Sequence, residues 1–346
     1  MAAHVSTRRV LGTLAALLAA GSLAFAQSAA PPAAPVAPRV QADTAGTAKR
    51  AAPMLLAPPA PPAPPSPVAG IRGKISAGDL LSAESILEVY REKHGEDVRY
   101  CSGLAWLARG ALLLGDDEKA RRYANDVRAR CADSLARLDQ NDDLAVALGA
   151  AIEVDAQLLE RERGAEAAAA MLSAELDRLE GPVSLRSRIN KRLNLISLAG
   201  RRAPELEVDD WLGARPPTLA SLKGRPVVLF LWAEWCADCR AQAASLARIK
   251  SRHAADGLQI LALSRYYEKA ADKRAAEKAR VDSVWKADYA GIGTIPLVMS
   301  TASMERYGGS STPTFVFVDR AGVVRDYTPT RLTDAEFERR LISILR

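Results

Sequence analysis

Between about Ser76 and Leu198, apolar residues recur every three or four positions, the spacing of a helix with one buried face. The clearest stretches are Leu80, Ala83, Ile86, Leu87 and Tyr90, followed by Leu104, Leu107, Ala111, Leu112 and Leu114. Glycines interrupt the pattern as turn or helix-end residues at Gly95, Gly115, Gly164 and Gly181. The pattern predicts about six helices joined by short turns.

A faint internal repeat lies within these helices. Gly78-Asp79 with Ala83 recurs 37 residues later as Gly115-Asp116 with Ala120. The segment from Leu104 to Ala124 resembles a tetratricopeptide repeat (TPR), because small residues stand where paired helices approach closely. A TPR-like array and a generic helical bundle both remain possible interpretations of residues 71–200.

From Ala203 onward the pattern alternates between strands and helices, which predicts an α/β domain over residues 203–346. Strands are expected at 226–232, 258–264, 295–299, 314–318 and 323–325, and helices at 237–255 and 269–284. Asp319 to Gly322 reads as a hairpin turn. Thr333 and Glu336 form a capping box that predicts a last helix.

The first 70 residues differ from both of these regions. Arg8-Arg9 precede an uncharged Leu/Ala-rich run and the small residues Ala24 and Ala26, which is typical of an export signal cleaved before Gln27. An uncleaved membrane anchor is the alternative. Residues 27–70 hold 12 of the 20 prolines and read as a semi-rigid Pro/Ala-rich linker.

Composition and charge add a few exclusions. The 49% apolar and 25% charged residues are typical of a globular protein. The net charge of +6 is not gathered into a Lys/Arg block, so the sequence does not support nucleic-acid binding. Export places the cysteines in a compartment where disulfides persist.

Cys236-Ala237-Asp238-Cys239 directly follows an apolar run that predicts a buried strand, and it opens a predicted helix. The spacing puts both sulfurs on one face of the helix. The first sulfur then lies over free amides at the positive end of the helix dipole, which stabilises the reactive thiolate. Trp235 is placed to shield the pair and to offer an apolar contact to an incoming chain.

The segment from Trp232 to Arg240 resembles the active site of the thioredoxin-like superfamily. The lead-in Ala203-Pro204-Glu205-Leu206 and the segment 219–226 resemble its exported TlpA-like branch, an AhpC/TSA–redoxin type of domain. Ser311-Thr312-Pro313-Thr314 is similar to the family's cis-proline loop.

This resemblance implies roles for single residues. Cys236 would be the exposed nucleophile that attacks a disulfide, and Cys239 would resolve the mixed disulfide. Pro313 would be cis and lie opposite Cys236, with the backbone of Thr312 pairing with the substrate chain. Together with Trp235, these two residues form the expected substrate-binding surface.

The sequence departs from the family at several positions. Asp238 places a negative charge beside the thiols, which opposes thiolate, and Arg240 is a candidate to compensate it, so both are expected to tune the redox chemistry. Phe230 stands where relatives often carry an internal Asp or Asn base, which leaves water or Glu234 as substitutes. The extra charged segment 269–287 is a partner surface or a solvated helix.

No cofactor or metal is implied by this chemistry. A zinc site needs two further ligands, and none of His4, His94 and His253 lies near a second cysteine pair in the sequence. A peroxiredoxin-type peroxidase needs Thr or Ser three residues before its reactive cysteine, where this chain has Ala233.

Cys101 and Cys131 form the other pair. They lie 14 residues before and 16 after Gly115, and hence level with each other on two antiparallel helices. In an oxidising compartment this predicts a structural disulfide. Two buried free thiols are the alternative.

The sequence therefore predicts an exported, periplasmic protein disulfide oxidoreductase. It is expected to act as a reductase of client proteins and to be kept reduced by a membrane thiol transporter. The alternative is an assembly protein whose helical domain holds an unknown partner.

Overall fold

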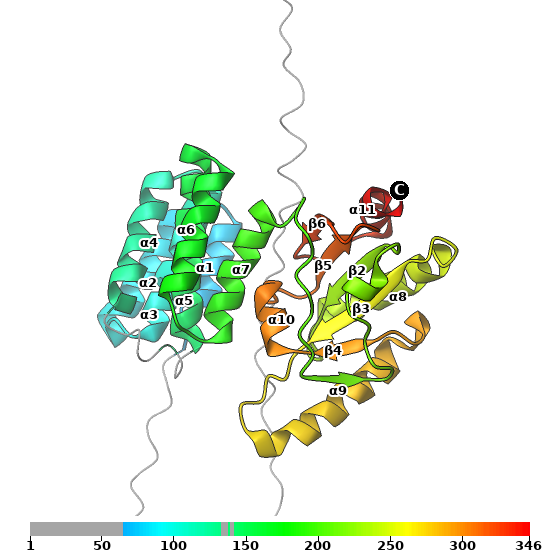
Figure 1. The fold of residues 1–346 in the computed structure, drawn as a ribbon. Coiled ribbons are helices and arrows are strands. Elements are labelled where there is room, and N and C mark those ends of the chain that lie inside the picture. The colour runs from blue at the N-terminus through cyan, green and yellow to red at the C-terminus, as the bar shows by residue number, and fades with distance from the viewer. Residues whose placement is uncertain (1–64, 133–137, 139–141) are drawn as a thin grey trace, which may run out of the picture. The chain divides into compact units, whose positions relative to one another are not determined.

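The computed structural model describes residues 65–132, 138 and 142–346. Within these residues the first part of the chain is helical and the second combines a sheet with helices (Figure 1). This confirms the predicted fold class. The helices of the first part are α1 (Val68–Ser76), α2 (Leu80–His94), α3 (Val98–Leu113), α4 (Asp117–Ala132), α5 (Asp142–Arg163), α6 (Ala165–Arg178) and α7 (Val183–Ser197).

The ends of these helices are encoded locally. Asp79 caps α2 by accepting a hydrogen bond from the Ser82 amide, and Asp97 caps α3 through the amides of Arg99 and Tyr100. Gly95 and Gly115 have φ values of 73° and 83°, which side-chain-bearing residues rarely adopt, so they reverse the chain as the sequence predicts.

Small side chains let the helices approach one another. Gly110 of α3 faces Ile75 of α1, where an added Cβ would lie 2.6 Å from the Ile75 Cδ1 atom. The small residues of the predicted repeat are fully buried at Ala108, Ala111, Ala120 and Ala124. Close packing therefore explains their spacing, and a TPR-like repeat stays a prediction.

A buried group of charges joins three of the helices. Glu153 of α5 is 2.7 Å from the Lys191 ammonium and 3.3 Å from the Arg188 guanidinium, both on α7, and it also pairs with Arg109 of α3. Burial alone would raise the pKa of Glu153, but the attraction of these cations lowers it well below its usual range. The carboxylate therefore stays charged inside the helical core.

The second part contains a mixed six-stranded sheet with the strand order β1-β4-β3-β2-β5-β6. Strands β2, β3 and β4 are parallel to one another, whereas β1, β5 and β6 pair antiparallel with their neighbours. The strands are β1 (Asp210–Leu212), β2 (Val227–Leu231), β3 (Gln259–Ser264), β4 (Leu297–Met299), β5 (Thr314–Val318) and β6 (Val324–Thr328).

Side chains of the central strand β2 alternate between two buried faces. Val228 and Phe230 enter one core together with α8 (Ala237–Arg252), α9 (Arg274–Asp288) and α11 (Asp334–Leu345). Val227, Leu229 and Leu231 enter the other core, which includes Met304 of α10 (Thr301–Arg306). A strand covered on both sides reads as a continuous apolar run, which is why β2 could be predicted.

Most of the predicted strands and helices of the second part are present. The capping box of Thr333 and Glu336 starts α11 as expected. The sequence missed the short elements β1 and α10. It also missed 3₁₀ turns at Ala220–Leu222, Ala271–Lys273 and Ala290–Ile292. The charged helix begins at Arg274 instead of Lys269.

Two further predictions concern the leader and linker before α1 and the boundary near residue 200. The leader 1–26 and the linker residues up to 64 lie outside the described residues, so both stay predictions; α1 already starts at Val68, before the predicted linker end at residue 70. The helical part and the sheet part belong to one compact unit, so the boundary near residue 200 stays a prediction. Among the described residues, none of the helices is long and apolar enough to cross a membrane.

Candidate active site

The cysteine pair lies where the buried strand β2 leads into helix α8. Cys236 is the residue before the helix, and its Sγ accepts a hydrogen bond from the Cys239 amide at 3.0 Å. The two sulfurs form a disulfide. An amide aimed at Cys236 at the helix start stabilises negative charge on that sulfur once the disulfide is reduced.

The accessibility of the two sulfurs differs less than the sequence predicts. Cys236 was expected to be exposed, but its exposed fraction is 5%, against 0% for Cys239. Of the two cysteines, only Cys236 keeps an exposed fraction above zero. The difference still has the expected direction.

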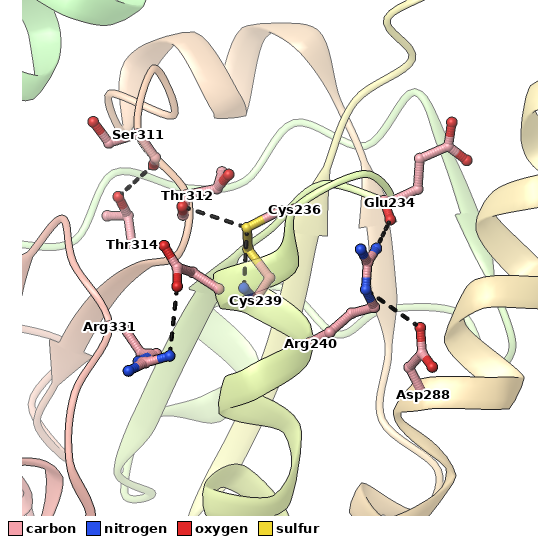
Figure 2. The surroundings of a disulfide bond; sticks show 10 residues. Glu234, Cys236, Cys239, Arg240, Asp288, Ser311, Thr312, Thr314 and Arg331 are labelled. Atoms are coloured by element: carbon pink, nitrogen blue, oxygen red, sulfur yellow. Dashed lines mark hydrogen bonds and ion pairs between the residues drawn. A yellow bond between two sulfur atoms is a disulfide. The ribbon is translucent and has the colours of Figure 1, made fainter. Parts of the chain in front are cut away.

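The loop before β5 lies opposite Cys236. The Thr312–Pro313 peptide bond is cis, as expected, and the carbonyl oxygen of Thr312 is 3.4 Å from the Cys236 Sγ. Thr314 Oγ1 donates a hydrogen bond to the Ser311 carbonyl at 2.7 Å, which fixes the loop on either side of the proline (Figure 2). The cysteine and the cis-proline loop therefore form one site, although they lie 76 residues apart.

The charge beside the pair has a partner that the sequence did not reveal. Arg331 Nη1 is 3.5 Å from Asp238 Oδ1. Arg240, the expected compensator, points elsewhere. Its guanidinium donates to the Glu234 carbonyl at 2.8 Å and lies 3.9 Å from the Asp288 carboxylate (Figure 2). Arg331 is therefore the cation that offsets Asp238.

The position of the missing internal base is apolar. Phe230 is fully buried and stacks on Phe315 with the ring centroids 5.4 Å apart. Glu234, one candidate substitute, turns its carboxylate away from the sulfurs (Figure 2) and places it 3.3 Å from Arg280. Burial raises the pKa of Glu234, and Arg280 offsets part of that effect. Glu234 is therefore not placed to take a proton from Cys239, and water stays the other substitute expected from the sequence.

Comparison with known proteins agrees with this geometry. Residues 199–327 match the model of the AhpC/TSA family. The sheet part of the chain has a thioredoxin-like fold. A thioredoxin-like protein of Bacillus subtilis (strain 168), YneN, is 27% identical over 143 residues, which cover 41% of this chain and 78% of the relative.

Two solved structures are similar to the thioredoxin-like domain. A thiol:disulfide interchange protein from Chlorobium tepidum is 21% identical and covers 42% of this chain and 96% of its own, with a TM-score of 0.35. The exposed lipoprotein thioredoxin Etrx1 of Streptococcus pneumoniae is 23% identical and covers 40% of this chain and 98% of its own, with a TM-score of 0.34.

Trp235 is the exposed aromatic residue of the thioredoxin-like site. Its exposed fraction is 44%, and its ring meets Tyr267 edge-on with the centroids 5.5 Å apart. Tyr267 belongs to the segment that follows β3, a contact that sequence reasoning missed. The local pattern around Tyr267 carries no signal for it, because the contact depends on β2 and β3 ending side by side.

The second cysteine pair differs from its prediction. Cys101 and Cys131 are free thiols in the structure instead of a disulfide, and both are buried. Arg130 and Tyr100 are the residues before Cys131 and Cys101, and the Arg130 guanidinium lies 5.1 Å from the centre of the Tyr100 ring. This contact agrees with the expected alignment of the two cysteines on neighbouring helices. Burial raises the pKa of both thiols, that of Cys131 to about 12. Both residues therefore pack as small apolar side chains.

Proposed function

We propose that the protein is an exported thiol–disulfide oxidoreductase that reduces disulfides in client proteins. The observation that carries this proposal is the position of Cys236, at the start of α8 and 3.4 Å from the Thr312 carbonyl oxygen. A client chain that pairs with the Thr312 backbone would bring its disulfide to that sulfur.

Reduction would proceed through two exchanges. The thiolate of reduced Cys236 attacks one client sulfur, so that a Cys236–client bond forms, the client S–S bond breaks, and the departing client thiolate takes a proton from water. Cys239 then loses its proton to water and attacks Cys236 Sγ. The second client sulfur leaves as a thiolate and takes a proton from water, and the protein ends with the Cys236–Cys239 disulfide present in the structure.

Electrons must then return from another dithiol, and we propose a membrane thiol transporter as their source. A strong oxidant stabilises its reduced form, commonly through a well-supported thiolate. Here Asp238 opposes the thiolate, Arg331 offsets it only in part, and the two residues between the cysteines are Ala and Asp. This arrangement favours a reductase.

The reduction potential tests that direction. Equilibration against a glutathione series, followed by Trp fluorescence, should give a value nearer to the roughly −270 mV of thioredoxin than to the roughly −120 mV of DsbA. Cys239→Ser, which cannot close the disulfide, serves as the control without a two-electron transition. A value above about −180 mV would overturn the reductase assignment.

An insulin-reduction assay separates this function from the other classes. The proposal expects turnover that depends on Cys236 and Cys239. A folded protein without turnover would favour an assembly role of the helical part. Consumption of peroxide without insulin reduction would favour a peroxidase, which the alanine at position 233 opposes.

Export is the second component of the proposal, and it rests on the pattern of residues 1–26. Cell fractionation of the full chain should recover a periplasmic form whose first residue is Gln27, identified by mass spectrometry. A full-length form in the membrane fraction would instead support an N-terminal anchor.

A further inference from the structure

The segment 265–268 follows β3 and lies against Trp235, the residue before Cys236. It leaves the end of β3 next to the end of β2, which leads to Trp235 and Cys236. The Tyr267 ring meets Trp235 at an interplanar angle of 73°. The Arg265 guanidinium lies 4.2 Å from the centre of the Tyr267 ring. The Arg265 guanidinium thus contacts Tyr267, which in turn contacts Trp235, the residue before Cys236.

A buried carboxylate holds the segment 265–268 in place. Glu277 of α9 has an exposed fraction of 1% and accepts hydrogen bonds from the amides of Tyr267, at 2.6 Å, and Glu268, at 3.1 Å. Arg280 of the same helix lies 3.3 Å from Glu234 and 3.8 Å from Glu268. The segment is therefore fastened to α9 through both its backbone and its side chains.

Arg265 differs from the other cations around the cysteine pair. Arg240 pairs with Asp288, Arg280 with Glu234, and Arg331 with Asp238. Within the described part of the chain, Arg265 forms no ion pair, and its guanidinium packs on the Tyr267 ring. Its charge remains available to a ligand, and stacking on Tyr267 orients it.

We propose that Arg265, Tyr267 and Trp235 form a client-selecting surface that takes extended chains with acidic residues near the target cysteine. The proposal rests on the proposed function and names its substrate class. An extended chain advances about 3.3 Å per residue. The ring contacts of 5.5 and 4.2 Å therefore place the guanidinium within about three extended residues of the Trp235 ring, which precedes the reacting Cys236.

Matched peptide disulfides test this selectivity. Three homodimeric peptides of equal length carry Asp, Asn or Lys at the third residue on either side of a single cysteine. The full-length protein, reduced beforehand, is mixed with each peptide, and each exchange rate is divided by the rate of the same peptide with dithiothreitol. This normalisation removes the intrinsic reactivity of each disulfide.

The expected order is Asp, then Asn, then Lys. The Asp peptide should exceed the Asn peptide by about twofold to fivefold, the range of an exposed ion pair. Arg265→Gln should bring the ratio close to one, whereas Arg265→Lys should keep most of it. Lys223→Gln removes an exposed cation next to the start of β2, away from Cys236, and should leave the ratio unchanged.

Two further readouts keep the outcome clear. In the unmodified protein, raising the salt concentration from 0.05 to 0.5 M should reduce the Asp/Asn ratio towards one. Equal rates for all three peptides at low salt, or an unchanged ratio in Arg265→Gln, would overturn the selectivity. The uncharged hydroxyethyl disulfide separates the two proposals. If the reduced protein does not react with it, the disulfide-exchange function itself is contradicted.

Discussion

The two cysteine pairs of this chain have the same residue type in opposite surroundings. Cys236 directly precedes a helix, and its sulfur accepts a hydrogen bond from the Cys239 amide. Cys101 and Cys131 lie inside the helical core, where burial raises the pKa of each thiol. The position of a cysteine on a helix thus decides whether it serves chemistry or packing.

The same contrast holds for the charges of the two regions. In the helical part, Glu153 is buried and surrounded by cations that keep it charged. Beside the active site, the Asp238–Arg331 pair is exposed to solvent. Buried charges are costly to leave unpaired, whereas exposed pairs adjust a reaction only slightly.

The largest expected effect comes from removing one sulfur from each pair. Cys236→Ser should reduce insulin-reducing activity to the level of the uncatalysed reaction, because the attacking thiolate is lost. Cys101→Ser should retain the activity of the unmodified protein. Loss of activity in a folded Cys101→Ser variant would show that the helical pair relays electrons.

The next largest effect concerns thiol alkylation in the reduced native protein. Burial raises the pKa of Cys131 from 9.0 to about 12, which lowers its thiolate fraction near neutral pH by about a thousandfold. Iodoacetamide labelling followed by mass spectrometry should modify Cys236 first. The rate at Cys131 should rise about tenfold per pH unit as long as the fold is intact.

Unfolding provides the matched control for that measurement. In denaturant and without reductant, Cys101 and Cys131 should both be labelled at once, because the structure holds them as free thiols. A mass that accounts for two unlabelled cysteines at these positions would instead reveal the disulfide predicted from the sequence.

A moderate effect on stability is expected when the helical pair is replaced. Cys101→Ala combined with Cys131→Ala removes two buried sulfur atoms, and each should cost about 1 kcal/mol of unfolding free energy. Chemical denaturation measures the change, and insulin reduction should stay at the level of the unmodified protein. Lower activity with unchanged stability would contradict a packing role.

The smallest effect is expected at the exposed charges. Asp238→Asn removes a negative charge near Cys236 and should raise the reduction potential, while Arg331→Ala exposes that charge and should lower it. An exposed pair contributes about 0.2–1 kcal/mol, which corresponds to about 5–20 mV for a two-electron couple. In the Asp238→Asn background, Arg331→Ala should have no further effect.

The sequence predicted the features that depend on neighbouring residues. The Cys236–Cys239 spacing, the Ser311–Thr314 loop and the capping box of Thr333 each carry their own local signal, and the structure contains all three elements.

It could not predict contacts that depend on the arrangement of the sheet. Arg331 meets Asp238 from 93 residues away, and Tyr267 reaches Trp235 only because β2 and β3 end side by side. The burial of Cys236 is another such feature, since the Thr312 carbonyl oxygen of the loop before β5 lies 3.4 Å from its sulfur.

Trapping of mixed disulfides tests most directly the claim that Cys236 is the attacking sulfur. In a chain that also carries Cys101→Ala and Cys131→Ala, Cys239→Ser should accumulate covalent complexes with disulfide-containing proteins, because no second sulfur resolves them. Cys236→Ser in the same background should accumulate few. Equal trapping by the two variants, measured on non-reducing gels with peptide mapping of the linked cysteine, would contradict the assignment.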